Sequence, residues 1–210
     1  MSYSRCMENY NIDESIKKRI IQERRRRNRR RRRIAGALAL ILALVCGHFL
    51  GKYIGDKAYA SYNKEITPTA EDVPIVNVAK EQLGNIGGEP FWSWYGFNSS
   101  QEWCACFASW CENELGYIDE DKAPKFALVG DGISWFIYRD QWLQPDATPV
   151  AGDLIFFDWD DDDIKDHVGI VSAVVGDKIF AIEGNSSDRC RVKVYNVGDE
   201  VIYGFGHINA

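Results

Sequence analysis

Cys104 is the residue of this chain best suited to act as a nucleophile. Aromatic and small residues recur around it at helical spacing and predict a buried helix that opens near Ser99 and Ser100. The unpaired N–H groups and the positive dipole end of a helix favour a thiolate, so a cysteine at the amino end is well placed for chemistry. We interpret Cys106 and Cys111, further along the same helix, as small core residues.

His167 and Glu183 are the predicted partners of Cys104. His167 begins one predicted strand and Glu183 ends the next, sixteen residues later. A five-residue connection over 173–177 would place the two side chains opposite each other. A two-residue turn at 176–177 would place them on opposite faces unless a bulge intervenes. A nucleophilic thiol needs an imidazole and a group that orients it, although these could also be two unrelated residues at strand ends.

The remaining elements predict an α+β fold. Helices are expected over 74–84 and 132–138, on either side of the cysteine helix, and the stretch 85–100 reads as a glycine-rich aromatic loop over a groove. We expect Trp94, Tyr95 and Trp103 to contact substrate there. Strands follow the helices, which favours an antiparallel sheet packed against the cysteine helix. The expected strands cover 153–158, 167–175, 178–183, 191–195 and 201–208.

The amino-terminal part of the 210-residue chain is opposite in charge to the rest. Residues 1–33 carry 13 Lys+Arg and 4 Asp+Glu, whereas the whole chain has a net charge of −6. The 18 residues at 34–51 have no formally charged side chain. A helix of this length measures about 27 Å, close to the hydrocarbon thickness of a bilayer.

This pattern predicts four segments. They are a basic cytoplasmic tail (1–33), a transmembrane helix (34–54), a linker (55–73) and a domain outside the cytoplasm (74–210), because arginines beside a span stay on the cytoplasmic side. We favour this over a nucleic-acid-binding role for the arginines. Cleavage near Ala60, which would release the domain, stays open.

No metal or cofactor is expected. The cysteine spacing does not suit zinc. The aspartates over 158–166 form a candidate calcium loop, but they lack the regular spacing of such loops and are interpreted as a solvated acidic turn. A disulfide between Cys190 and either Cys106 or Cys111 is left open.

Four short motifs follow one another in the chain: Glu102-Trp103-Cys104-Ala105, Gly152-Asp153-Leu154, His167-Val168-Gly169-Ile170-Val171 and Glu183-Gly184-Asn185. In this order they resemble the CHAP domain, the cysteine, histidine-dependent amidohydrolase/peptidase family. The resemblance covers about residues 74–210 and implies a papain-like fold that hydrolyses bacterial peptidoglycan. It also implies that Cys104 is the nucleophile, His167 the general base, Glu183 the orienting acid and Asn185 a fourth polar member.

The resemblance implies an N-acetylmuramoyl-L-alanine amidase or a cross-bridge endopeptidase. Two alternatives are a catalytically silent wall-binding or scaffolding module of an envelope assembly, and a related hydrolase of a non-wall amide. Peptidoglycan and the bacterial membrane, reached through residues 34–54, are the expected partners, without nucleic acid. The oligomeric state is not predicted.

Overall fold

The computed structural model describes residues 22, 26, 34, 38, 41–54, 72–160 and 164–209. The chain divides into two compact units, Met1–Ile54 and Gly55–Ala210. In the first unit, residues 41–54 form an exposed helix. Within the described part of the chain, no helix is both long enough and apolar enough to cross a membrane. Most of the predicted tail, the start of the predicted span and nearly all of the predicted linker lie outside the described residues.

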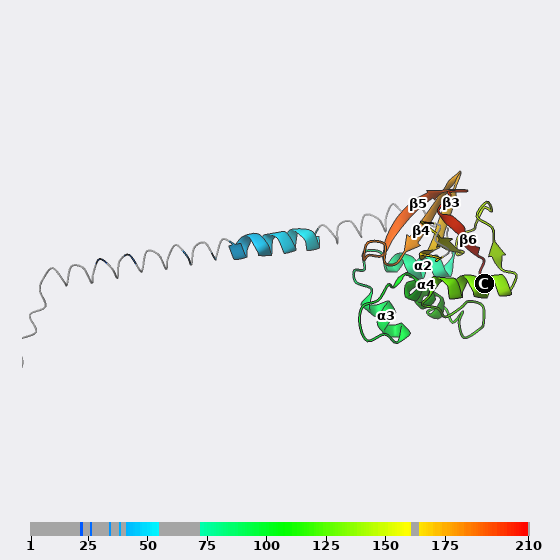
Figure 1. Cartoon of the computed structure of the whole chain (residues 1–210), viewed down its shortest axis with the longest axis horizontal. Helices are drawn as coiled ribbons and strands as arrows, with labels where there is room; N and C mark the ends of the chain where they lie inside the picture. The colour runs from blue at the N-terminus through cyan, green and yellow to red at the C-terminus, as the bar shows by residue number, and fades with distance from the viewer. Residues whose placement is uncertain are drawn as a thin grey trace, which may run out of the picture. The chain divides into compact units, whose positions relative to one another are not determined.

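In the described part of the second unit, helices precede the main strands, as predicted (Figure 1). They are α2 (Pro74–Glu81), α3 (Glu89–Tyr95), α4 (Cys104–Asn113) and α5 (Val129–Tyr138). The prediction of a loop over 85–100 was wrong, because α3 lies within it. Gly88 adopts a left-handed conformation before α3, Pro90 lies in its first turn and Gly96 ends it, also left-handed.

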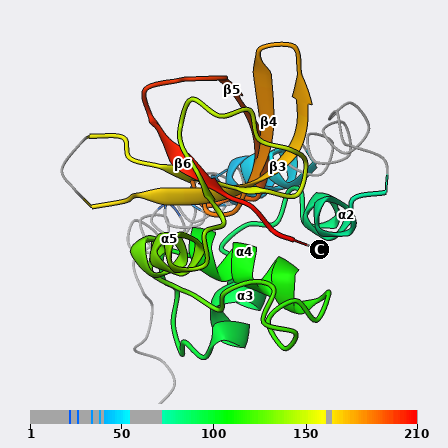
Figure 2. The same ribbon diagram turned by 90° about the vertical axis from the view of Figure 1, so that its right-hand side faces the viewer.

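The strands that follow form one antiparallel sheet in the order β1-β6-β2-β3-β4-β5, which confirms the predicted α+β class. Figure 2 shows α3, α4 and α5 gathered on one side of this sheet. The sequence did not predict β1, which has only two residues. The strands are β1 (Trp142–Leu143), β2 (Leu154–Phe157), β3 (His167–Val175), β4 (Lys178–Glu183), β5 (Arg191–Asn196) and β6 (Ile202–Gly206).

The central strands are buried on both faces. Successive side chains of a strand point to opposite faces, so alternate residues enter two hydrophobic clusters. Phe156 and Ile170 pack with the helices, whereas Ile155, Phe157 and Val171 form the second cluster, against which Tyr195 of β5 packs. Burial on both sides accounts for the nearly continuous apolar character of β2 and β3.

Glu112 of α4 is an acid inside this core. The residue is fully buried and neither carboxyl oxygen has a hydrogen-bond partner among the described residues. Burial raises the pKa of Glu112 well above its ordinary value. The folded protein therefore binds a proton at Glu112 more tightly than the unfolded chain does, and this contribution to stability is lost as the pH rises.

We expect Glu112→Gln to be more stable than the wild type at pH 8, by about 1–3 kcal/mol, because the amide has no charge to desolvate. The advantage should shrink toward pH 4, where the carboxyl group is protonated in both states. Thermal unfolding at the two pH values measures it, with Glu114→Gln, at the exposed C-cap residue of the same helix, as the matched control. Equal stabilisation at both pH values would contradict a neutral buried carboxyl group.

Candidate active site

Cys104 is the first residue of α4. Trp103 takes the N-cap position without a side-chain cap bond, so the helix begins a few residues later than the expected start near Ser99 and Ser100. The backbone N–H groups of this first turn lack partners within the helix and point toward its amino-terminal end, where Cys104 lies. Cys104 is only 5% exposed, which places the sulfur at the margin of the core.

His167 and Glu183 meet at the ends of their strands. His167 is the first residue of β3 and Glu183 the last of β4, and Nε2 of the imidazole lies 3.1 Å from Oε2 of the carboxylate. Both side chains are almost completely buried. The turn between these strands has two residues, and β3 has a register shift between Val171 and Ala173, before the turn. The bulge restores the shared face, so the second of the two predicted geometries is the one observed.

Gly169 makes room for this contact. Ile170 pairs with Ile182, so continuing the register by one residue brings Glu183 opposite Gly169. A Cβ atom on Gly169 would lie 2.9 Å from Cγ of Glu183 and 3.3 Å from the carbonyl oxygen of Ile182. The missing side chain therefore lets the carboxylate reach along the sheet to the imidazole of His167.

We expect Gly169→Ala to displace Glu183, to lower the activity by about tenfold and to reduce the free energy of unfolding by about 1–3 kcal/mol, because the added methyl group overpacks a filled site. Gly130→Ala on α5 is the matched control, since a Cβ there meets no atom within 4 Å. Parallel activity and unfolding measurements test this. Full activity in Gly169→Ala would contradict the role given to the small residue.

The imidazole of His167 contacts the thiol as well as the carboxylate. Burial by itself lowers the pKa of His167, but hydrogen bonds to Cys104 and Glu183, together with their negative charges, raise it to about 9. Since Nε2 faces Glu183, Nδ1 is the ring nitrogen available to the sulfur. An imidazolium at neutral pH would stabilise a thiolate beside it. The structure thus brings Cys104, His167 and Glu183 together, as the sequence predicts.

Two aromatic residues around the imidazole were not predicted. Tyr195 donates a hydrogen bond from Oη to Oε1 of Glu183 at 2.6 Å. Trp159 is 53% exposed and stacks on His167, with ring centroids 5.0 Å apart, while its backbone N–H donates to Asp166. No sequence signal marks either residue, because their positions depend on the register of β5 and on the path of the acidic loop.

Asn185 lies beside this group but faces a different partner. Its backbone is left-handed, with φ of 58°, and its side-chain amide donates to the carboxylate of Glu102. With neighbouring polar residues it lines a pocket of about 640 Å³. The pocket is lined by Ser100, Gln101, Glu102, Asn185, Ser187 and Asp188.

The three predicted substrate-contacting aromatics differ in placement. Trp103 has no exposed surface; it stacks on Phe91 and its indole N–H lies 3.4 Å from a carboxylate oxygen of Asp188. It therefore packs in the core and does not line an open groove. Trp94 and Tyr95 are half-buried on α3, and the ammonium group of Lys125 lies 4.7 Å and 5.1 Å from their ring centroids.

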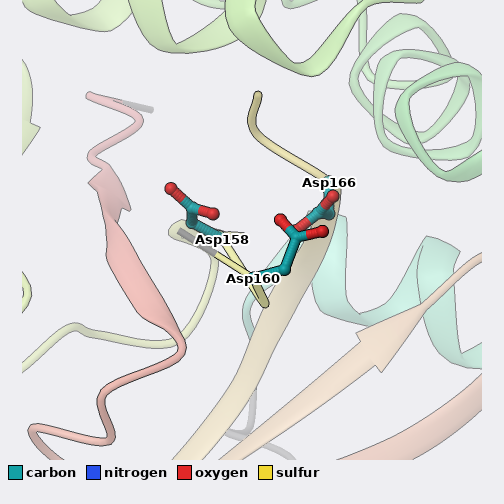
Figure 3. A group of neighbouring side chains, drawn as sticks. All are labelled: Asp158, Asp160 and Asp166. Atoms are coloured by element: carbon teal, nitrogen blue, oxygen red, sulfur yellow. The ribbon is translucent and has the colours of Figure 1, made fainter. Parts of the chain in front are cut away.

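The acidic loop contributes three carboxylates that approach one another (Figure 3). One oxygen from each of Asp158, Asp160 and Asp166 lies within 4.8 Å of the others. Among the described residues these are the ones that could hold a cation, although Lys165 already forms an ion pair with Asp158. Residues 161–163 of the predicted turn lie outside the described part.

The cysteines form neither of the disulfides considered from the sequence, because Cys106 and Cys111 are free thiols. Burial, followed by the negative charge of Cys104, raises the pKa of Cys106 to about 11. Cys106 is therefore protonated at neutral pH. Of the two cysteines in the first turn of α4, only Cys104 contacts the imidazole of His167.

The fold and the site define the class of this protein. It is an α+β domain that has a cysteine at the start of a helix, with a buried histidine and a buried glutamate at one end of an antiparallel sheet. Residues 94–185 match the family model of the CHAP domain, which confirms the resemblance read from the motifs. This match contains Cys104, His167, Glu183 and Asn185. No curated protein matches the sequence.

Several solved structures resemble the chain. Ly7917 is 16% identical with a TM-score of 0.45, covering 64% of this chain and 61% of that one. Ly7917 with the hydrolysing product of MDP is 17% identical with a TM-score of 0.44, covering 64% and 62%. A Staphylococcus aureus subsp. aureus Mu50 protein, SAV0400, described as similar to a lipoprotein of the NLP/P60 family, is 18% identical with a TM-score of 0.38, covering 68% and 44%. The chain thus spans less than two thirds of each of these structures.

Proposed function

We propose that this chain is a cysteine-dependent amide hydrolase that acts on bacterial peptidoglycan. The observation that carries the proposal is the buried His167, which contacts Cys104 on one side and Glu183 on the other. The match to the CHAP domain supports amide hydrolysis and supports peptidoglycan as the substrate. Amidase and endopeptidase activities use the same chemistry at this site, so the scissile bond is decided by the products.

The proposed reaction is acyl transfer in two steps. The thiolate of Cys104 attacks the amide carbonyl, the C–N bond breaks and the imidazolium of His167 gives its proton to the departing amine. Water, deprotonated by His167, then attacks the thioester and releases the acid and the thiol. Glu183 holds the imidazole and stabilises its charged form. The backbone N–H groups at the start of α4 are positioned to stabilise the oxyanion.

Mass analysis of digested murein tests this proposal. We expect the full-length chain to create one class of new amine and carboxyl ends in purified murein. Ends at the muramoyl-alanine bond would identify an amidase, and ends within the peptide would identify an endopeptidase. If the folded protein binds murein but creates no new amine or carboxyl ends in it, the binding-module alternative would be favoured.

We also propose that the domain acts outside the cytoplasm and is anchored by residues 34–54. The apolar run at 34–51 and the arginines that precede it support this placement. In cells that express the full-length chain, protease added outside the membrane should digest the domain but spare an epitope at the amino terminus. Digestion of both only after lysis would contradict the topology.

A further inference from the structure

Tyr195 occupies a position from which it can control the site without touching the sulfur. Its ring packs against Phe157, with centroids 4.7 Å apart, and its hydroxyl lies on the carboxylate of Glu183. Glu183 divides its two oxygens between neighbours, Oε2 toward His167 and Oε1 toward Tyr195. The chain of contacts thus runs from β5 through β4 to β3 and ends at the imidazole.

We propose that Tyr195 is a positioning residue, which fixes the carboxylate of Glu183 and through it the charge and orientation of His167. This inference rests on the proposed function only for its effect on hydrolysis. Glu183 is 1% exposed, so water cannot readily replace the hydroxyl as a partner for Oε1. A buried carboxylate that loses a donor becomes harder to ionise and less able to stabilise an imidazolium beside it.

The hydroxyl of Tyr195 is a permanent donor. Burial, followed by the charge of Glu183 and the hydrogen bond to it, raises the pKa of Tyr195 above its ordinary value. Asp199 adds to this effect, and Arg191 lies opposite Glu183 across the β4–β5 pair. Cys104 contacts the imidazole itself, and Asp166 precedes His167 in the chain and accepts a hydrogen bond from the backbone N–H of Trp159. The experiment must leave these charged and titratable groups unchanged.

Tyr195→Phe tests the proposal, because it keeps the ring and its packing on Phe157 and removes only the hydroxyl. The imidazole titration of His167 in the full-length chain, followed by NMR, is the readout that a purely structural role would not move. We expect its midpoint to fall from about 9 by about one pH unit, which is a tenfold change in proton affinity. The alkaline decline of hydrolysis should move down by the same amount, from about pH 9 to about pH 8. Tyr138→Phe, at an 89% exposed residue, is the control and should change neither.

A double-mutant cycle with Glu183→Gln separates action through the carboxylate from a direct effect. If Tyr195 acts through Glu183, adding Tyr195→Phe to Glu183→Gln should shift the His167 midpoint no further. An unchanged midpoint in folded Tyr195→Phe, or an equal shift in both backgrounds, would overturn the proposal. The titration needs no substrate, so a wild type that leaves murein intact would defeat the proposed function without deciding the role of Tyr195.

Discussion

Replacing Cys104 by alanine should lower the release of new ends from murein by at least about 1,000-fold, because no other group in the site can form the acyl intermediate. Cys104 is the thiol that contacts the imidazole at the start of α4. The fold should survive, since the residue lies at the margin of the core and alanine suits a helix. Measured rates on purified murein, with unfolding curves alongside, give the comparison.

Cys106→Ala is the matched control for this loss. Cys106 lies two residues further on the same helix, is fully buried and is protonated at neutral pH. Its replacement leaves a small cavity, so we expect a modest drop in stability with the rate largely kept. A Cys104→Ala protein that turns over murein as fast as Cys106→Ala would remove the nucleophile from the mechanism.

His167→Gln should lower the rate to a similar extent, because the thiol loses its base and the amine loses its proton donor. In the wild type the imidazolium is present below pH 9 and is lost as the pH rises through about 9. The rate should therefore decline on the alkaline side near that value, and the residual rate of His167→Gln should lack this decline. A pH–rate profile from pH 5 to 10 measures both effects.

His207→Gln provides the control for His167→Gln. Nδ1 of His207 lies 2.8 Å from Oδ1 of Asp153, which precedes β2, whereas His167 pairs with Phe157 at the other end of that strand. The two histidines therefore occupy opposite ends of β2. We expect His207→Gln to keep both the rate and the alkaline decline. Equal losses in the two variants would point to a general effect of histidine replacement.

The sequence predicts most of the strands because β3 and β4 are long apolar runs bounded by turn residues. It also predicts the meeting of Cys104, His167 and Glu183, because each lies at the end of an element. The backbone geometry that brings these side chains together could not be predicted. The bulge after Val171 and the space at Gly169 depend on strand pairing, and a single residue of register decides which face a side chain occupies.

The errors have similar physical causes. Glycine and proline are typical of loops, but here Gly88 and Pro90 lie at the start of the short helix α3 and Gly96 lies at its end. Trp103 belongs to the set of aromatic residues at helical spacing, and the face of the helix that carries this set is buried, so Trp103 lies in the core. The roles of Tyr195 and Trp159 were not predicted, because contacts made across a sheet or from a loop produce no regular residue spacing in the sequence.

Labelling of Cys104 by a haloacetamide at pH 6 to 7 tests the central claim most directly, since it reports the state of the sulfur without any substrate. In the full-length chain, mapped by peptide mass, we predict that Cys104 reacts faster than Cys106 and Cys111 and that His167→Gln slows this reaction by at least about tenfold, because the imidazolium that stabilises the thiolate is gone. Labelling of Cys104 at the same rate in the wild type and in His167→Gln would contradict an activated thiol at this site.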